Sequence, residues 1–390
     1  MDDKILILNG DSTQAIPLIN SFHKSGYIID VVCHSKYGYG SSSKYINNKY
    51  YWKNTQKHDE YCTFLVSIIK NKQYLIVIPC DDDAATILSK YKDILLCYTQ
   101  YVAPDYNIYT KGYDKHLLMA LCQEKGYPHP KTYTVKGNNL NEIDVNNLPY
   151  PILIKPNYTC GARGMTYIAS KDDLLEKFPI IYNEYGECHL QQFIPAGGNQ
   201  IEVQLYINEN KELIQSSVIK KYRWYPENGG SSCCNVSCVN QDIVNICYSI
   251  LKDLDWVGFA DFDTIEDPST GELLIMEINP RLPACIKSAF VSGVDWADVL
   301  INEYLHKSHK SYQAKEGLWL RHLGFEILWF LYSKNRFKTT PSWFKFWGNN
   351  VFYQDMSSLS DPMPFIKGTL GNILKQLSPE FRKAKSGTRK

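Results

Sequence analysis

The chain has 390 residues, which is enough sequence for two or three domains with sizeable cores. Its 42 lysines and arginines nearly balance its 41 aspartates and glutamates, so its charge gives no argument for a nucleic-acid partner. The 12 cysteines lack the spacing of a disulfide framework, and no secretory leader precedes the first expected strand. We therefore expect a cytoplasmic protein, and the longest apolar stretch, residues 318–332, is too short for a transmembrane segment.

The first hundred residues alternate between apolar runs and helical patterns, which predicts a doubly wound parallel-sheet domain over residues 1–105. The turn after the first strand, residues 9–14, lacks the three-glycine fingerprint, so nothing supports nucleotide binding by this domain. The acids at 81–83 follow a strand and could face a ligand, but capping of the next helix is favoured. The expected strands of this domain are residues 4–8, 28–33 and 74–79.

Beyond the first hundred residues, helical patterns are mixed with strands that alternate apolar and polar side chains. A helix over residues 111–126 should end at Gly126, because glycine commonly closes a helix. The other expected elements are helices at 171–185 and 242–252 and strands at 151–156, 189–195, 201–207 and 213–221.

The most informative segment is residues 258–281. Turn-forming residues 266–272 separate two apolar runs, so the runs should form neighbouring antiparallel strands. Asp263 on the first strand and Glu277 on the second would then lie side by side. Their oxygens suit Mg²⁺, although a hairpin with solvated acids is the simpler alternative.

Four motifs occur in order along the chain. They are Asp114-Lys115 at a helix start, Ile154-Lys155-Pro156 before a glycine-bearing loop, the strand at 190–195, and the hairpin that ends in Glu277-Ile278-Asn279-Pro280-Arg281. In this order and spacing they resemble the ATP-grasp superfamily over residues 106–307. The resemblance implies an α/β protein whose ATP-grasp lobes are α+β. The implied division is an N-terminal pre-ATP-grasp domain over 1–105, a lid lobe over about 115–188, a C-terminal lobe over about 189–307 and an aromatic-rich, partly helical appendage over 308–390.

The resemblance also implies that Lys115 and Lys155 pair with the phosphates of ATP. A lone lysine is usually a solvated surface group, but Lys155 ends an apolar strand just before a proline. The loop after it would aim backbone N–H groups at phosphate oxygens, because glycine allows close approach, although an ordinary turn is the alternative. The loop residues implied in ATP binding are Thr159, Gly161 and Gly164.

The adenine hinge implied by the family is the segment Gln191-Gln192-Phe193-Ile194. Many members carry an acid near Gln191, and glutamines stand here instead. Glu202 could hold the ribose. The ligands implied for one or two Mg²⁺ ions, or for Mn²⁺, are Asp263, Glu277 and Asn279.

Residues 219–232 contain a basic strand and a glycine-serine loop, a pattern similar to superfamily members related to carbamoyl phosphate synthetase and D-aspartate ligase. Lys220 or Lys221 could face the γ-phosphate; strand alternation forbids both, and Lys221 is favoured. The loop could equally be an exposed hairpin tip. Arg281 is implied as the cation for a developing oxyanion or the transferred phosphoryl group. Asp261 stands where the D-alanine ligase branch has an arginine, which disfavours that branch. The candidate catalytic residues are Lys155, Lys221 and Arg281.

The resemblance implies an ATP- and Mg²⁺-dependent carboxylate–amine ligase, in which a carboxylate is activated as an acyl phosphate and an amine then attacks. The alternatives left open are phosphorylation or carboxylation of another small acceptor, and a regulatory protein that binds ATP without turnover. Small-molecule substrates are expected, and a homodimer is a family-level expectation. The region after residue 308 could pack onto the body or touch a membrane or a partner, and its basic tail is more often simply solvated.

Overall fold

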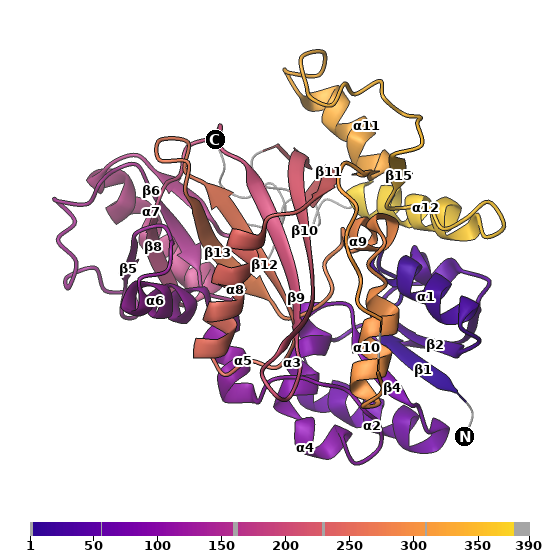
Figure 1. Ribbon diagram of the computed structural model, residues 1–390. Coiled ribbons are helices and arrows are strands. Elements are labelled where there is room, and N and C mark those ends of the chain that lie inside the picture. Colours follow the sequence, from indigo (N-terminus) through magenta and orange to yellow (C-terminus); the bar gives the residue numbers. More distant parts are fainter. Residues whose placement is uncertain (1–2, 56, 159–162, 228–230, 309, 378–390) are drawn as a thin grey trace.

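Figure 1 shows a computed structural model of the chain, which describes residues 3–377 apart from 56, 159–162, 228–230 and 309. Three sheets organise the described residues, two with four strands and one with seven. The seven-stranded sheet lies in the middle of the molecule, between the two smaller ones (Figure 1).

The N-terminal sheet is parallel throughout, with the strand order β3-β2-β1-β4, so the doubly wound prediction is confirmed. Residues 5–8 are fully buried, as expected for a strand with helices on both faces of its sheet. Asp81 caps α3 by accepting a hydrogen bond from the Ala84 N–H at 2.8 Å, which confirms the capping interpretation for this acid. The elements are β1 (Lys4–Leu8), α1 (Ala15–Lys24), β2 (Ile28–Cys33), η1 (Gly40–Ser42), β3 (Ile46–Tyr51), α2 (His58–Lys72), β4 (Ile76–Pro79), α3 (Asp82–Lys90) and α4 (Lys92–Leu95).

The second four-stranded sheet is antiparallel and has the order β5-β8-β6-β7. One of its faces packs on α7, where Ile154 and Leu190 share a core with Phe178. β8 pairs within this sheet, although the predicted lobe boundary lies near its start; the domain limits stay predictions. The elements are α5 (Tyr106–Tyr113), α6 (Lys115–Lys125), β5 (Thr132–Thr134), β6 (Ile152–Pro156), β7 (Thr166–Ile168), α7 (Lys171–Tyr185) and β8 (Cys188–Gln192).

The helix expected over residues 111–126 begins later than predicted, at Lys115. Asp114 interrupts the helical run, because its carboxylate accepts hydrogen bonds from the N–H groups of His116 at 2.8 Å and Leu117 at 3.1 Å. This N-cap separates α5 from α6 and places Lys115 at the first position of α6.

The seven-stranded sheet has the order β13-β12-β9-β10-β11-β14-β15 and is antiparallel except for its last pair. One face packs on α8, where Val203 and Ile275 share a core with Ile250. The opposite face carries the polar residues described below. The elements are β9 (Gln200–Ile207), β10 (Leu213–Tyr225), β11 (Ser231–Cys238), α8 (Gln241–Asp253), β12 (Gly258–Glu266), β13 (Leu273–Asn279), β14 (Trp319–Arg321) and β15 (Val351–Tyr353).

After β13 the chain returns to the N-terminal sheet and then to the far edge of the seven-stranded sheet. Trp296 and Leu300 share a core with Leu18 of α1. α11 and the loop after it stand out from the body, and α12 lies on the same side of the molecule (Figure 1). Among the helices that the structure describes, none combines the length and apolarity needed to cross a bilayer. The remaining helices are α9 (Lys287–Ser292), α10 (Trp296–Tyr304), α11 (Leu323–Tyr332) and α12 (Met363–Leu377).

Candidate functional site

The hairpin of β12 and β13 has the register that the sequence predicted for its two acids. Asp263 lies directly opposite Glu277, and Asp261 lies opposite Asn279. Because side chains alternate along a strand, these four residues share one face of the sheet. The prediction that the two carboxylates stand side by side is confirmed.

The neighbouring strands bring a fifth polar group and a lysine to this face. Glu202 on β9 lies opposite Asp263. Lys221 on β10 places its Nζ 2.7 Å from Glu202 Oε2 and also forms an ion pair with Asp263. Lys220 instead lies over the ring of Tyr222, with 5.2 Å between Nζ and the ring centroid. Of the two lysines left open by the sequence, Lys221 is therefore the one that joins the acids.

The electrostatics of this cluster follow from its burial. Burial raises the pKa of Asp261 well above its usual value, and the charges of Glu202 and Asp263 raise it further. Burial opposes the charged form of Lys221, but the surrounding carboxylates outweigh it and raise the pKa of this lysine. Oδ1 of Asp261 is buried and has no hydrogen-bond partner. This face therefore holds charged groups, and among the described residues none donates a hydrogen bond to Asp261 Oδ1.

Arg281 follows β13 and connects this cluster to the N-terminal domain. Its Nε lies 3.1 Å from Asp82 Oδ1. Its Nη1 lies 3.6 Å from Asp261 Oδ2, and its Nη2 donates a hydrogen bond to Asn279 Oδ1 at 3.2 Å. Sequence reasoning treated the acids after β4 mainly as helix caps and missed the contact of Asp82. Beside the arginine is a pocket whose lining includes Ile78, Tyr109, Phe259 and Leu282.

Lys115, at the start of α6, contacts the hairpin, and Lys155 lies on the smaller antiparallel sheet. Lys115 places its Nζ 3.3 Å from Glu277 Oε2. Lys155 on β6 lies opposite His189 on β8. Burial, the charges of Lys155 and His116, and finally that of Lys115 hold the pKa of His189 well below its usual value. Lys115 and Lys155 thus act on the same buried, neutral ring.

The same face of β8 carries two buried acceptors. His189 Nδ1 lies 2.9 Å from Asn157 Oδ1, while its Nε2 is buried without a hydrogen-bond partner. Gln191, two residues on, donates from Nε2 to Thr132 Oγ1 at 3.2 Å and leaves its Oε1 buried and unpartnered. Unsatisfied buried acceptors are rare, so this surface is suited to a ligand that carries donors.

The segment predicted as the adenine hinge leaves the end of β8. Gln192 Oε1 accepts a hydrogen bond from the Lys131 N–H at 3.1 Å, and Phe193 meets Tyr167 edge-on with 5.1 Å between ring centroids. Ile194 is buried. The segment is therefore buried or half-buried and has apolar side chains around it.

Gly164 has a φ of +71°, and a Cβ there would lie 2.8 Å from Pro156 Cγ and 2.9 Å from Tyr185 Cδ2. Only glycine therefore fits this position without displacing its neighbours. Thr159 and Gly161 lie outside the described residues. Glu202 lies with the carboxylates of the large sheet rather than with the hinge, so its role toward a ribose stays a prediction.

The donor set of the hairpin fits Mg²⁺. Within the residues that the structure describes, no three His, Cys, Asp or Glu side chains are grouped as metal ligands. The candidate site instead offers two carboxylates and one amide, from Asp263, Glu277 and Asn279, all hard oxygen donors on one face. The unpartnered oxygen of Asp261 beside them and the ammonium groups already paired with the acids show that this face accommodates positive charge.

Comparison with known proteins places residues 113–285 within the family model of the ATP-grasp domain. D-aspartate ligase of Enterococcus faecium (strain Aus0004) is 26% identical over 230 residues, which cover 54% of this chain and 54% of that protein. D-alanine–D-alanine ligase of Thermoanaerobacter sp. (strain X514) is 23% identical over 228 residues, which cover 53% and 62%. The match therefore spans a little over half the length of these two curated relatives.

Solved structures share the fold. Biotin carboxylase of Campylobacter jejuni, in its complex with a β,γ-ATP compound, matches with a TM-score of 0.67 at 14% identity over 80% of this chain and 73% of that chain. L-amino acid ligase of Bacillus licheniformis matches with a TM-score of 0.60 at 14% identity over 77% and 74%.

Proposed function

We propose that this chain, whose residues 113–285 match the ATP-grasp domain, is an ATP- and Mg²⁺-dependent ligase that joins a carboxylate to an amine. The observation that carries the proposal is the face of the large sheet where Asp263, Glu277 and Asn279 lie beside three cations. Phosphoryl transfer is accelerated mainly by positioning and charge neutralisation, and such a face supplies both.

In the proposed reaction, a carboxylate oxygen of the substrate attacks the γ-phosphorus of ATP. The bond from that phosphorus to the bridging oxygen breaks, and an acyl phosphate and ADP form. The nitrogen of an amine then attacks the acyl carbon, the carbon–oxygen bond to phosphate breaks, and inorganic phosphate leaves while the nitrogen loses a proton. Holding both reactants in one site contributes much of the acceleration.

The cations of the chain would hold the phosphates. The hairpin carboxylates and Asn279 would hold Mg²⁺, which would supply charge neutralisation at the phosphate oxygens. Lys115 of α6 and Lys221 of β10 pair with the hairpin acids, and Lys155 on β6 would reach the phosphates from the four-stranded antiparallel sheet. Arg281 is held by Asp82 and Asn279, so its guanidinium stays beside the hairpin oxygens, where it would stabilise the transferred phosphoryl group.

The four-stranded antiparallel sheet that contains β8 would bind the adenine base of ATP. Oε1 of Gln191 is a buried acceptor without a partner, and the exocyclic amino group of adenine is a donor of the required kind. A glutamine amide accepts this hydrogen bond as a carboxylate would. The glutamine that stands where many family members carry an acid is therefore compatible with adenine binding.

A coupled ADP-release assay with a panel of amino acids as carboxylate and amine substrates tests the proposal. Glu277→Gln and Lys155→Ala are expected to abolish ATP turnover. Glu272→Gln, on the exposed turn of the same hairpin, and Lys136→Ala, on an exposed loop, are the matched controls and should keep wild-type rates.

ADP release at the wild-type rate from either Glu277→Gln or Lys155→Ala would refute the residue assignment. Mg²⁺-dependent ATP binding without turnover on the whole panel would overturn the ligase and favour the regulatory alternative. A cytoplasmic location and a homodimer stay predictions.

A further inference from the structure

Exposed apolar side chains gather in the C-terminal region. Among the described residues, 25 large hydrophobic side chains are exposed, and 13 of these lie between residues 327 and 377. This stretch is about an eighth of the chain. A concentration of exposed apolar side chains in one region is typical of an interaction surface.

Helix α12 has one face that packs on the body and one that does not. Gly368 and Gly371 form the packed face: a Cβ at Gly368 would lie 2.2 Å from Tyr39 Cδ1, and one at Gly371 would lie 2.4 Å from Tyr37 O. The opposite face consists of exposed apolar residues at helical spacing. We call it the apolar stripe of α12; its residues are Met363, Ile366, Leu370, Ile373, Leu374 and Leu377.

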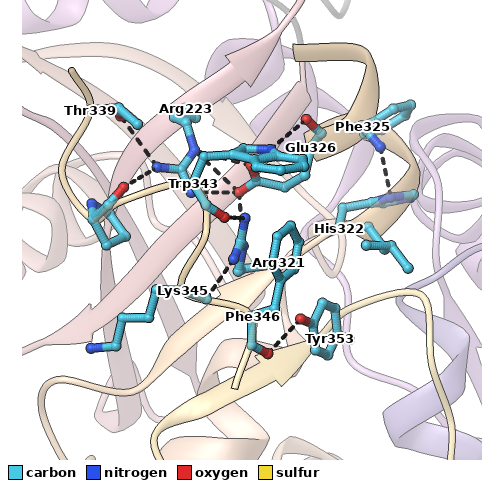
Figure 2. Close-up of polar contacts among 12 residues, drawn as sticks. Arg223, Arg321, His322, Phe325, Glu326, Thr339, Trp343, Lys345, Phe346 and Tyr353 are labelled. Carbon is cyan, nitrogen blue, oxygen red and sulfur yellow. Dashed lines mark hydrogen bonds and ion pairs between the residues drawn. The ribbon is translucent and has the colours of Figure 1, made fainter. Parts of the chain in front are cut away.

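The aromatic loop, residues 333–350 after α11, exposes a second set. Trp347 is 85% exposed and Phe337 is 72% exposed. Hydrogen bonds hold the base of the loop, because Arg321 donates to the carbonyl oxygens of Lys345 at 2.6 Å and Trp343 at 2.8 Å (Figure 2). The loop therefore presents its rings from a fixed base.

The charge of this region has one sign at the surface. Residues 327–377 contain two acids, Asp355 and Asp361, and both are buried. Asp361 accepts a hydrogen bond from Ser43 Oγ at 2.6 Å, so it is satisfied inside the protein. The six basic residues of the stretch are exposed or half-exposed; they are Lys334, Arg336, Lys338, Lys345, Lys367 and Lys375.

We propose that this side of the molecule docks on the surface of a membrane that contains anionic lipids, with the apolar stripe of α12 and the rings of the aromatic loop at the level of the headgroups. An apolar helix face flanked by basic residues is the pattern of interfacial binding, and tryptophan is enriched at that depth. A helix and a loop that share only apolarity and positive charge fit a deformable anionic surface better than a rigid partner. The proposal is independent of the ligase reaction.

Co-sedimentation of the full chain with large unilamellar vesicles tests it. One vesicle preparation contains phosphatidylcholine alone and the other contains phosphatidylcholine and phosphatidylserine in a ratio of about 7:3. The chain is expected to sediment with the second preparation only, and less so as salt is raised.

Variants locate the surface. Each basic residue near an anionic surface strengthens binding about fivefold, so the triple change of Lys334, Arg336 and Lys338 to Glu should weaken it at least about 100-fold. The double change Leu370→Ser with Ile373→Ser should weaken it about tenfold or more. The matched control is Leu175→Ser with Ile180→Ser, on an exposed face of α7, which should bind like the wild type.

The proposal is overturned if the wild type binds neither preparation, binds both equally, or is matched by the charge and stripe variants. It is also overturned if sedimentation velocity shows a dimer that the stripe variant converts to a monomer, because the stripe would then cover a second copy of the chain. The lipid and salt dependence of the unmodified chain decides the question even where a variant fails to fold.

Discussion

Two buried ion clusters lie in the same seven-stranded sheet, and they differ in how far the chain satisfies them. In the first, at β10, β14 and α11, Glu326 lies 2.7 Å from Arg223 and 3.1 Å from Arg321 (Figure 2). Other guanidinium N–H groups donate to the hydroxyl of Thr339 and to backbone carbonyl oxygens of the C-terminal region. Those carbonyls belong to Pro341, Trp343 and Lys345.

The second cluster, on β9, β10, β12 and β13, is incomplete. Asp261 Oδ1 is buried without a hydrogen-bond partner, and so is Oδ1 of Asn235, which lies on β11 opposite Lys221. Buried polar groups normally find partners, so the difference carries information. The first cluster is satisfied within the chain, whereas the second leaves buried oxygens unpaired, which is what the proposed nucleotide and metal site requires.

The largest expected effect is on the second cluster. Asp263→Asn should lower the rate of ADP release at least about 1,000-fold, because a metal carboxylate is lost. The pair between Lys221 and Glu202 survives this change, so the free energy of unfolding should shift by no more than about 1 kcal/mol. Steady-state kinetics and urea unfolding measure the two quantities; a large loss of stability with normal turnover would reverse the comparison.

The opposite pattern is expected in the first cluster. Glu326→Ala leaves two buried guanidinium groups without their carboxylate, which should cost about 3–5 kcal/mol of unfolding free energy. ADP release per folded molecule should change little. Glu316→Ala, on an exposed loop, is the control for urea unfolding. A loss below about 1 kcal/mol would show that this network is not structural.

Ligand-dependent stability sharpens the same contrast. A non-hydrolysable ATP analogue with Mg²⁺, at about 100 times its dissociation constant, should stabilise the wild type by about 2.7 kcal/mol. Asp263→Asn should lose most of this stabilisation, whereas Glu326→Ala in the first cluster should keep it. Thermal unfolding with and without the ligands measures the gain, and an equal gain in Asp263→Asn would contradict the assignment.

The smallest effect concerns a half-buried pair outside both clusters. Burial opposes protonation of His34, but its hydrogen bond to Asp81 at 2.8 Å and the charge of Asp81 raise its pKa from 6.5 to about 9. A raised pKa stabilises the folded state fully below pH 6.5, and this contribution is lost as the pH rises through about 9. After a discount for partial exposure, the contribution of this pair to the free energy of unfolding is on the order of 1–2 kcal/mol.

Urea unfolding at pH 6 and pH 9.5 measures this contribution as the difference between wild type and His34→Asn. The difference should be present at the lower pH and absent at the higher one. A constant difference across this range would show that the pair does not titrate between these values.

The hairpin was predictable because local rules fix it. Turn residues and strand alternation set the register that places Asp263 opposite Glu277. The same alternation allows only one of Lys220 and Lys221 to face the acids, and Lys221 is the one that does. The resemblance to the ATP-grasp domain is supported by the family match over residues 113–285, and the parallel N-terminal sheet and the α/β class are confirmed by the structure.

Long-range partners could not be predicted from local patterns. Arg223 and Glu326 are 103 positions apart, and no spacing rule connects them. The contact between Asp82 of α3 and Arg281 after β13 is likewise long-range, and no local pattern indicates it. β14 was missed because it has only three residues, too few for a periodicity to be visible.

The lysines that neutralise the hairpin acids have a thermodynamic consequence. Lys115 and Lys221 already serve as counter-ions there, so a metal ion arriving alone must compete with two tethered ammonium groups. Phosphate oxygens would draw those groups away and release the carboxylates. We therefore expect the nucleotide to tighten the affinity for the ion by the same factor by which the ion tightens the affinity for the nucleotide. Loss of the nucleotide after each cycle should weaken the hold on the ion as well.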